Sequence, residues 1–349
     1  MPDTADDSDT TTAHGRVRRG EPPEPRDGVH VAPVPLTLQH GGRLDGARLA
    51  WRLHGDERLP VVVALGGISA GRDVYWPGDR ERGWWREVVG PGLAIDTTQV
   101  RLLGIDWIGG SGGSTGPRPQ QADFPAISSF DQARMLESLR RELNIERYAA
   151  MVGASYGGMV ALAFARLHPE SVARIVVIGA AHRSHPQATA WRSLQRRIVR
   201  FGLEHGDGVG GLRLARALAM VTYRTPREFA QRFTGPPEIE GGSYVFPVER
   251  YLKAQGDRSL RYIPESYLCL SESIDLHAVD PRAISTPATL IGVTEDQLVP
   301  IEDMRALARD LAGPCRLHEI SSLYGHDAFL KENDMLKPLL SRVLTREAP

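Results

Sequence analysis

The chain has 349 residues, of which 41% are hydrophobic, and this is enough to bury a large core. Lys and Arg number 42 and Asp and Glu 43, so the formal net charge is −1 and no overall field favours nucleic acid or an anionic membrane. The only two cysteines, Cys269 and Cys315, exclude a disulfide framework and a thiolate metal site, and a reducing, cytoplasmic setting fits them best.

The N-terminal segment is polar and has no apolar central run that could serve as a secretory signal. Its content of Asp, Thr, Pro, Arg and Gly predicts a disordered extension over residues 1–30. Nowhere do about 18 apolar residues follow one another, so the sequence predicts no membrane-spanning helix.

The first ordered elements are expected to be strands. Segments 35–38 and 47–53 alternate loosely around glycine-containing turns, which predicts an opening antiparallel hairpin. Residues 61–65 then form an unbroken apolar run that ends in Gly66 and Gly67, as in a strand buried on both faces.

Strands and helices alternate further along the chain. Short apolar runs followed by glycine-containing loops or turns predict four more strands, at 100–105, 148–152, 175–178 and 288–291. Residues 131–143 carry the apolar spacing of a helix. Because parallel strands need long crossovers, this order predicts an α/β fold with a mainly parallel sheet flanked by helices.

This alternation is interrupted over residues 185–283. The interruption contains expected helices at 190–201, 211–220 and 226–233 and no strong buried strand. We therefore expect a helical lid inserted into a core formed by residues 31–184 and 284–349. A lid in this position commonly forms the pocket for the acceptor substrate.

Residues 153–157 read Gly-Ala-Ser-Tyr-Gly and match the pattern G-x-S-x-G. An expected strand precedes them and a helix-favouring segment, 159–166, follows them, which is the context of a nucleophile elbow. The glycines permit the sharp turn, and Ser155 would point away from the sheet. We interpret Ser155 as the nucleophile of an α/β-hydrolase fold.

A serine hydroxyl needs a base and an orienting carboxylate, and in this fold the acid and then the histidine follow the serine along the chain. Asp296 lies just after the strand 288–291 and is the strongest candidate for the acid, although the adjacent Glu295 could take that role. His326 follows Gly325 in a late loop and is the candidate base. The expected oxyanion donors are the backbone N–H groups of Tyr156 and Ile68.

From about residue 35 onward the chain resembles the homoserine O-acyltransferases of the MetX type. The resembling segments are 42–50, 83–85, 89–92, 109–117, 220–224 and 325–330. The match is most specific in the Gly-Ser-Thr-Gly-Pro sequence of 113–117 and the Gly-His-Asp-Ala-Phe sequence of 325–329.

The resemblance implies that acyl-CoA acylates Ser155 and that the hydroxyl of L-homoserine accepts the acyl group in methionine biosynthesis. Arg224 would bind the carboxylate of homoserine, where a guanidinium fork suits two oxygens, and Asp327 would bind its amino group. The resemblance implies a homodimer built through the lid, with acyl-CoA as co-substrate. No permanently bound cofactor and no metal are expected.

Two departures from the acetyl-transferring members lie where the acyl group should rest. The loop 66–70 reads Gly-Gly-Ile-Ser-Ala, and the elbow has Ala-Ser-Tyr rather than Gly-Ser-Met. The glycine-opened loop resembles the succinyl-transferring branch, which makes succinyl-CoA the expected donor. Arg72 and Arg192 could pair with the extra carboxylate of a succinyl group, and the basic segment 191–197 could face the phosphates of CoA.

Several other functions share these features. Homoserine O-acetyltransferase and serine O-succinyltransferase differ only in donor or acceptor, and one methylene in a pocket gives only about 10–200-fold discrimination. A serine ester hydrolase would keep the same triad and use water as the acceptor. A binding module without catalytic activity is disfavoured because the triad residues occur complete and in order.

Overall fold

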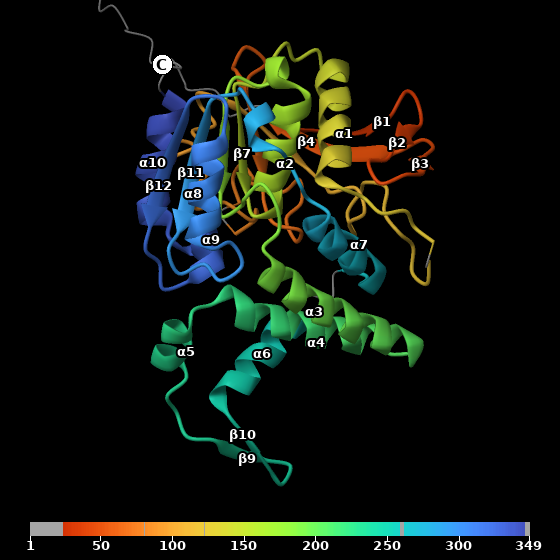
Figure 1. The fold of residues 1–349 in the computed structure, drawn as a ribbon, viewed down its shortest axis with the longest axis vertical. Helices are drawn as coiled ribbons and strands as arrows, with labels where there is room; N and C mark the ends of the chain where they lie inside the picture. The colour runs from red at the N-terminus through yellow and green to blue at the C-terminus, as the bar shows by residue number, and fades with distance from the viewer. Residues whose placement is uncertain (1–23, 80, 122, 259–261, 346–349) are drawn as a thin grey trace, which may run out of the picture.

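The computed structural model describes residues 24–79, 81–121, 123–258 and 262–345 (Figure 1). Its centre is an eight-stranded sheet. In spatial order the strands are β1 (Arg26–Val31), β4 (Arg48–His54), β6 (Arg101–Ile105), β5 (Val61–Leu65), β7 (Ala150–Ala154), β8 (Ile175–Ile178), β11 (Ala288–Val293) and β12 (Cys315–Ile320). The pairs β1–β4 and β4–β6 are antiparallel and every other pair is parallel, which confirms the mainly parallel sheet.

The sheet is buried on both faces, as the unbroken apolar run of β5 predicts. Val61 and Val63 belong to one hydrophobic core, whereas Val62 and Ala64 belong to the other. Helices α1 (Ser129–Glu142), α2 (Tyr156–Leu167) and α8 (Ile301–Asp310) cover the first face. Segment 85–95 and α10 (Asn333–Thr345) cover the second.

The N-terminal part of the sheet differs from the sequence expectation. The expected disordered extension included residues 26–30, but these lie in β1, which pairs with β4. Arg52 Nε donates to Asp27 Oδ1 at 2.5 Å, and the buried His30 contacts Ser138 of α1 at 2.8 Å. The strand is therefore held by its backbone ladder with β4 and by these side-chain contacts, rather than marked by apolar periodicity. Residues 1–23 lie outside the described residues.

The expected hairpin between 35–38 and 47–53 is also wrong. The two-residue strand β2 (Leu36–Thr37) pairs with β3 (Arg43–Leu44), whereas β4 joins the main sheet between β1 and β6. Both edges of β4 are therefore paired, and its residues from Leu49 to His54 are all buried.

Residues between β8 and β11 form a mainly helical layer that lies below the sheet in the view of Figure 1. Its first three helices, α3, α4 and α5 of the list that follows, occupy the three segments expected to be helical. The layer comprises α3 (Pro186–Glu204), α4 (Gly208–Tyr223), α5 (Pro226–Arg232), β9 (Glu238–Glu240), β10 (Ser243–Val245), α6 (Pro247–Asp257) and α7 (Pro264–Asp275). None of the helices in the described part of the chain is long and apolar enough to cross a membrane.

Candidate active site

Ser155 lies at the sharp turn between β7 and α2. Its φ of 54° falls in the region that favours glycine, so the backbone here is strained. The turn also needs the glycines on either side. A Cβ on Gly157 would lie 2.3 Å from the Leu65 carbonyl oxygen, and one on Gly153 would lie 2.2 Å from the Gly157 carbonyl oxygen. The G-x-S-x-G pattern thus has a steric cause, and the turn presents the serine hydroxyl to a cavity.

His326 lies on the short 3₁₀ helix η3 (Gly325–Asp327), which follows β12. Its Nε2 is 2.8 Å from Ser155 Oγ, and its Nδ1 is 2.7 Å from Asp296 Oδ2. The carboxylate can only accept, so Nδ1 carries the proton and Nε2 is free to accept the serine proton. The structure therefore brings together the three residues expected from the sequence.

The structure also distinguishes Asp296 from its neighbour Glu295. Asp296 Oδ1 accepts from the N–H groups of Leu298 and Val299 at 2.8 and 3.0 Å, which leaves Oδ2 for His326. Glu295 instead accepts from the Ser321 hydroxyl and the Ser322 N–H, at 2.5 and 2.8 Å. It braces the loop after β12 and makes no hydrogen bond with the imidazole.

Charges around the imidazole favour its protonated form. Burial alone would lower the pKa of His326, but the charge and hydrogen bond of Asp296 and the charge of Asp327 outweigh it and raise the pKa. Because the pKa is raised by folding, its contribution to stability is complete at low pH. That contribution is lost as the pH rises through the folded-state pKa.

The raised pKa of His326 predicts a pH profile if its neutral form acts as the base. Turnover, measured as kcat/KM between pH 5 and 9, should fall on the acidic side with an inflection above 6.5, the usual value for histidine. In Asp296→Asn the residual activity should show an inflection at lower pH. An inflection below 6.5 in the unchanged protein would contradict the assignment.

The two expected oxyanion donors flank the serine. The N–H of Tyr156 opens α2, where the first amides of a helix lack partners within the helix. The loop bearing Ile68 is close by, since a Cβ on Gly67 would lie 4.0 Å from that of Ser155. Trp107 fixes this loop by donating from Nε1 to the Gly67 carbonyl at 3.0 Å. The role of both N–H groups remains a prediction.

Arg224 and Asp327 lie beside the triad and line the same cavity. Both side chains are buried, and Arg224 Nη2 is 3.0 Å from Asp327 Oδ2. Arg224 also contacts Glu228 at 3.3 Å, while its Nε has no hydrogen-bond partner among the described residues. A buried donor without a partner is costly, so Arg224 keeps a hydrogen-bonding capacity that its two carboxylate neighbours do not use.

The cavity between the sheet and the lid has a volume of about 360 Å³. Its wall carries more cationic than anionic side chains. The six cationic ones are Arg183, Arg192, Arg216, Arg224, Arg258 and Lys331, and the two anionic ones are Asp303 and Asp327. It therefore suits anionic ligands, despite the nearly neutral chain. Arg216 and Tyr267, which no sequence pattern singles out, also line it, as does Gln195 from the segment 191–197.

The two arginines proposed for an acyl carboxylate are separated by the fold. Arg192 lines the cavity that contains Ser155, whereas Arg72 lies outside it and contacts Asp106 at 3.4 Å. Among the described residues, no group of three or more His, Cys, Asp or Glu side chains is arranged to hold a metal ion.

Comparison with known sequences and structures identifies the fold of the chain. The sequence profile of the alpha/beta hydrolase fold matches residues 60–333. A homoserine O-acetyltransferase from Bacillus anthracis has the same fold, with a TM-score of 0.83 at 20% identity over 94% of this chain and 99% of that one. The chain therefore has the α/β-hydrolase fold expected from the sequence.

Curated relatives then define the family. A homoserine O-succinyltransferase from Xanthomonas campestris pv. campestris is 40% identical over 89% of this chain and 82% of that protein. A homoserine O-acetyltransferase from Thermobifida fusca is 32% identical over 96% and 97%, and a serine O-succinyltransferase from Litchfieldella anticariensis is 31% identical over 90% and 97%. The chain belongs to the homoserine O-acyltransferase family of α/β-hydrolase enzymes, and it is an acyltransferase.

Proposed function

We propose that the protein is a homoserine O-succinyltransferase, which moves a succinyl group from succinyl-CoA to the hydroxyl of L-homoserine. The observation that carries this proposal is the hydrogen-bonded series Ser155, His326 and Asp296, which opens into a cavity with an excess of cationic side chains. The donor is anionic through its phosphates and carboxylate, and the acceptor, a zwitterion, also presents a carboxylate.

The proposed reaction has two halves that share one base. As Ser155 Oγ attacks the thioester carbonyl, His326 Nε2 takes the hydroxyl proton, and the N–H groups of Tyr156 and Ile68 stabilise the oxyanion. The intermediate collapses by breaking the carbon–sulfur bond, and His326 returns the proton to the CoA thiolate. The acyl group is then held as an ester of Ser155.

In the second half, His326 deprotonates the hydroxyl of homoserine as this oxygen attacks the ester carbonyl. Collapse of the second intermediate breaks the bond to Ser155 Oγ, which regains the proton from His326. The products are O-succinyl-L-homoserine and free enzyme. The protein's groups alone supply base, nucleophile and oxyanion donors, so the proposal includes no metal and no permanently bound cofactor.

Two features support succinyl as the acyl group. The relative from Xanthomonas campestris is named a succinyltransferase, and the loop 66–70 reads Gly-Gly-Ile-Ser-Ala.

The mouth of the cavity carries the exposed cations Arg183, Arg258 and Lys331, which suit the phosphates of CoA. A reducing cytoplasm suits the protein, because Cys269 and Cys315 are both free thiols.

A donor and acceptor panel tests this proposal. Succinyl-CoA and acetyl-CoA should each be combined with L-homoserine, L-serine and no acceptor, and CoA release and ester product measured separately. We expect the highest kcat/KM for succinyl-CoA with homoserine, and ping-pong kinetics. Preference for acetyl-CoA or for serine would overturn the assigned substrates. CoA release that is equally fast without an acceptor would identify a hydrolase.

Arg224 is proposed to bind the carboxylate of homoserine, with Asp327 beside it for the amino group. Arg224→Ala should lower kcat/KM for homoserine about 10- to 100-fold, because a charged hydrogen bond is lost. Acylation of Ser155 by the donor should change much less. Single-turnover CoA release and steady-state transfer, measured on the same preparation, separate the two effects. Unchanged homoserine kinetics would contradict the assignment.

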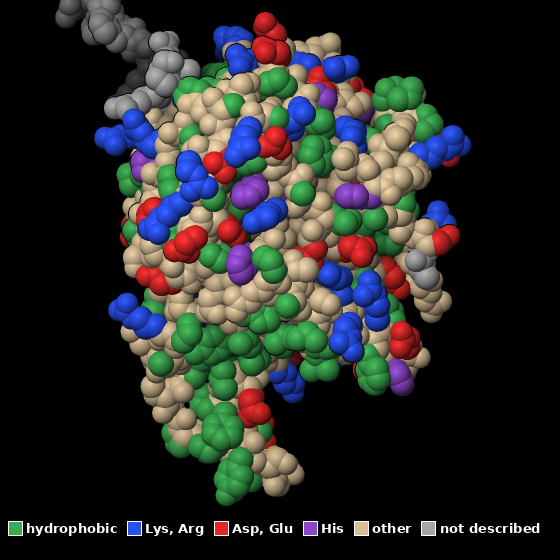
Figure 2. Space-filling view, viewed as in Figure 1, with side chains coloured by type: hydrophobic (Ala, Val, Ile, Leu, Met, Phe, Trp, Pro, Cys, Tyr) green, Lys and Arg blue, Asp and Glu red, His purple; other side chains and the backbone are tan. Residues whose placement is uncertain are grey.

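We also propose a homodimer formed through the lid. Eight of the thirteen exposed large hydrophobic side chains in the described part of the chain lie between residues 194 and 246. Figure 2 shows hydrophobic side chains gathered over the lid, at the bottom of the view. A second copy can cover such a patch through a two-fold axis, because each copy presents the same surface.

Light scattering after size-exclusion chromatography tests the dimer. The unchanged chain should elute with twice the mass of one copy. Phe201 and Leu214 are two of the most exposed side chains of the hydrophobic patch on the lid. The double variant Phe201→Asp with Leu214→Asp should be a monomer, because a dimer would bury each new charge without a partner. A monomer in the unchanged protein at micromolar concentration would contradict the proposal.

A further inference from the structure

A second series of serine, histidine and carboxylate joins α1 to β1, the strand at one end of the sheet. His30 Nε2 is 2.8 Å from Ser138 Oγ, and His30 Nδ1 forms a hydrogen bond with Glu142 Oε2. An ionised carboxylate can only accept, so Nδ1 carries the proton and Nε2 accepts from the hydroxyl of Ser138. The hydroxyl, imidazole and acid are thus connected in the same order as in the candidate active site.

The spacing of residues along α1 explains this arrangement. Ser138 and Glu142 are four residues apart, so they lie on the same face of the helix, about one turn from each other. On β1, His30 is buried, whereas Val29 and Val31 on either side of it are exposed. The strand therefore turns its imidazole toward α1, where each ring nitrogen contacts one of the two helix side chains.

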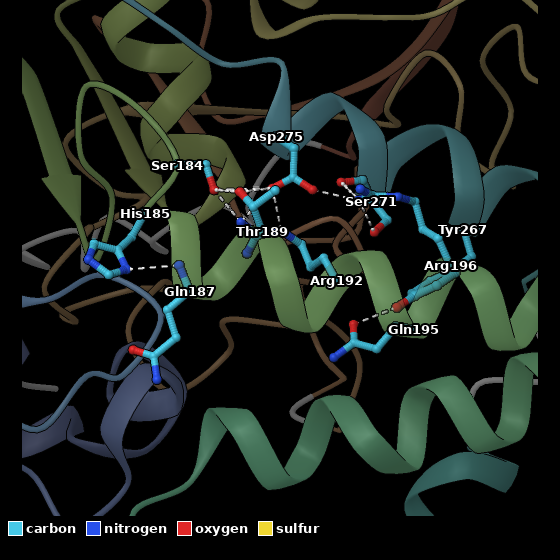
Figure 3. A network of polar contacts seen from close by, with 10 residues as sticks. All are labelled: Ser184, His185, Gln187, Thr189, Arg192, Gln195, Arg196, Tyr267, Ser271 and Asp275. Atoms are coloured by element: carbon cyan, nitrogen blue, oxygen red, sulfur yellow. Dashed lines mark hydrogen bonds and ion pairs between the residues drawn. The ribbon is translucent and has the colours of Figure 1, made fainter.

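Other serines in buried polar networks are bound differently. In the lid, Arg192 pairs with Asp275 at 2.7 Å, and the Ser184 hydroxyl contacts this carboxylate directly at 3.1 Å (Figure 3). Ser129 contacts His277 Nδ1 at 2.7 Å, but Nε2 of His277 has no hydrogen-bond partner among the described residues, so no carboxylate orients that ring. A base that is held by an acid distinguishes Ser138 from these two serines.

Ser138 is partly exposed and opens into a cavity of about 760 Å³. His30 and Glu142 line the same cavity, so the whole series borders it. Among the described residues, none lines both this cavity and the one that contains Ser155. The segment 31–36, which consists of Val, Ala, Pro and Leu, forms an apolar part of the wall and suits an apolar ligand group.

Acyl transfer through Ser138 also needs donors for the oxyanion. Arg134 and Arg141 lie four residues before and three residues after Ser138, so they share its helix face, and both line the cavity. Arg141 Nε donates to Glu137 at 2.7 Å, which fixes its guanidinium beside the helix. Nε2 of His168, in the same wall, is buried and has no hydrogen-bond partner among the described residues. His168 therefore keeps a hydrogen-bonding capacity that the protein does not use.

We propose that Ser138 is a second nucleophile, which hydrolyses small uncharged carboxylic esters independently of Ser155. Ser138 Oγ attacks the ester carbonyl as His30 Nε2 takes its proton, and the intermediate collapses by expelling the alcohol, which receives that proton. A water molecule, deprotonated by His30, then attacks the acyl group, and Ser138 Oγ leaves and regains the proton as the carboxylic acid forms. Glu142 is a positioning residue, and the activity does not rest on the transfer proposed for Ser155.

A fluorophosphonate probe, which bonds covalently to activated serines with loss of fluoride, tests the inference in Ser155→Ala. This variant lacks the first nucleophile, so any remaining label reports another one. We expect one adduct by intact mass, located on the tryptic peptide 135–140, whose only hydroxyl side chain is that of Ser138. Absence of label from this peptide at excess probe would overturn the inference, and this result requires no change to the contact between β1 and α1.

Hydrolysis of p-nitrophenyl butyrate by Ser155→Ala measures the activity itself. Adding Ser138→Ala should lower the rate above that of buffer about 100-fold, the lower end of what a positioned base contributes. Ser129→Ala is the matched control, because Ser129 also lies on α1 and contacts a histidine but does not line the cavity. It should leave the rate unchanged. An unchanged rate with Ser138→Ala, or an equal loss in both variants, would mean that the series only holds β1 against α1.

Glu142→Gln tests the positioning role. A glutamine can donate its NH₂ to His30 Nδ1, which moves the ring proton to Nε2 and stops that nitrogen from accepting from Ser138. The maximal rate of labelling in the Ser155→Ala background should fall at least about tenfold, while the probe concentration for half of that rate should not change. A change in the half-saturating concentration alone would show that Glu142 only shapes the cavity, and would overturn its assigned role.

Discussion

Ser155→Ala is expected to lower kcat for acyl transfer by roughly 10⁶-fold, the scale on which serine enzymes lose activity when the nucleophile is removed. The hydroxyl at the elbow is 2.8 Å from His326 Nε2, and alanine leaves the base without an oxygen to activate. Steady-state rates of CoA release and of ester formation should fall together. Only the weak contribution of binding and of the oxyanion donors should remain.

A second replacement separates chemistry from folding. Ser155 has a φ of 54°, which costs a residue other than glycine some strain. Ser155→Gly should therefore be as inactive as Ser155→Ala, and its melting temperature should equal or exceed that of Ser155→Ala. Activity near that of the unchanged protein in either variant would mean that the acyl group does not pass through this hydroxyl.

Asp296→Asn is expected to lower kcat by about 10⁴-fold, as is typical when the acid of a triad becomes an amide. The two N–H groups that bind Oδ1 fix the side chain, so an asparagine would present its NH₂ to His326 Nδ1. That contact favours the tautomer with the proton on Nε2, which cannot accept from Ser155. Steady-state rates, with far-ultraviolet circular dichroism as a folding control, measure the effect.

Glu295→Gln is the matched control for Asp296→Asn, since it makes the same chemical change one residue away. Its side chain accepts from Ser321 and Ser322 and not from the histidine. We expect a small effect on kcat and a modest loss of thermal stability. A larger loss of activity in Glu295→Gln than in Asp296→Asn would assign the acid to the wrong residue.

The parts of the fold that local sequence dictates were predictable. The buried strands near residues 61, 150 and 175 are apolar without interruption, and the elbow glycines occur where a Cβ would collide with backbone. Ser155, Asp296 and His326 each follow the end of a strand, namely β7, β11 and β12, in the chain order that this fold uses. These features depend on a few neighbouring residues, so the sequence carries them directly.

Features that depend on distant partners were not predictable. The strand β1 has no apolar periodicity, and its backbone pairing with β4 and contacts such as Arg52 with Asp27 and His30 with Ser138 hold it in place. The cluster of Arg192 and Asp275 joins residues 83 positions apart, and no local pattern marks either partner. The pairing of Arg224 with Asp327 likewise becomes visible only when lid and core meet.

Two further lid helices carry a local signal in the sequence. The helices α6 and α7 begin at Pro247 and Pro264, and proline is favoured in the first turn of a helix. Apolar spacing predicts only three helices in the lid, at 190–201, 211–220 and 226–233. The two prolines therefore mark the starts of α6 and α7, and α7 is the helix that carries Asp275.

The central claim is that an acyl group is transferred by way of Ser155 to an amino-acid hydroxyl. The most direct measurement is the intact mass of the protein, quenched after mixing with succinyl-CoA and again after a chase with L-homoserine. We expect a gain of one succinyl group located by peptide mapping at Ser155, its disappearance in the chase as O-succinyl-L-homoserine forms, and no gain in Ser155→Ala. Product formation with no adduct at any time, or an adduct that persists in Ser155→Ala, would contradict the account.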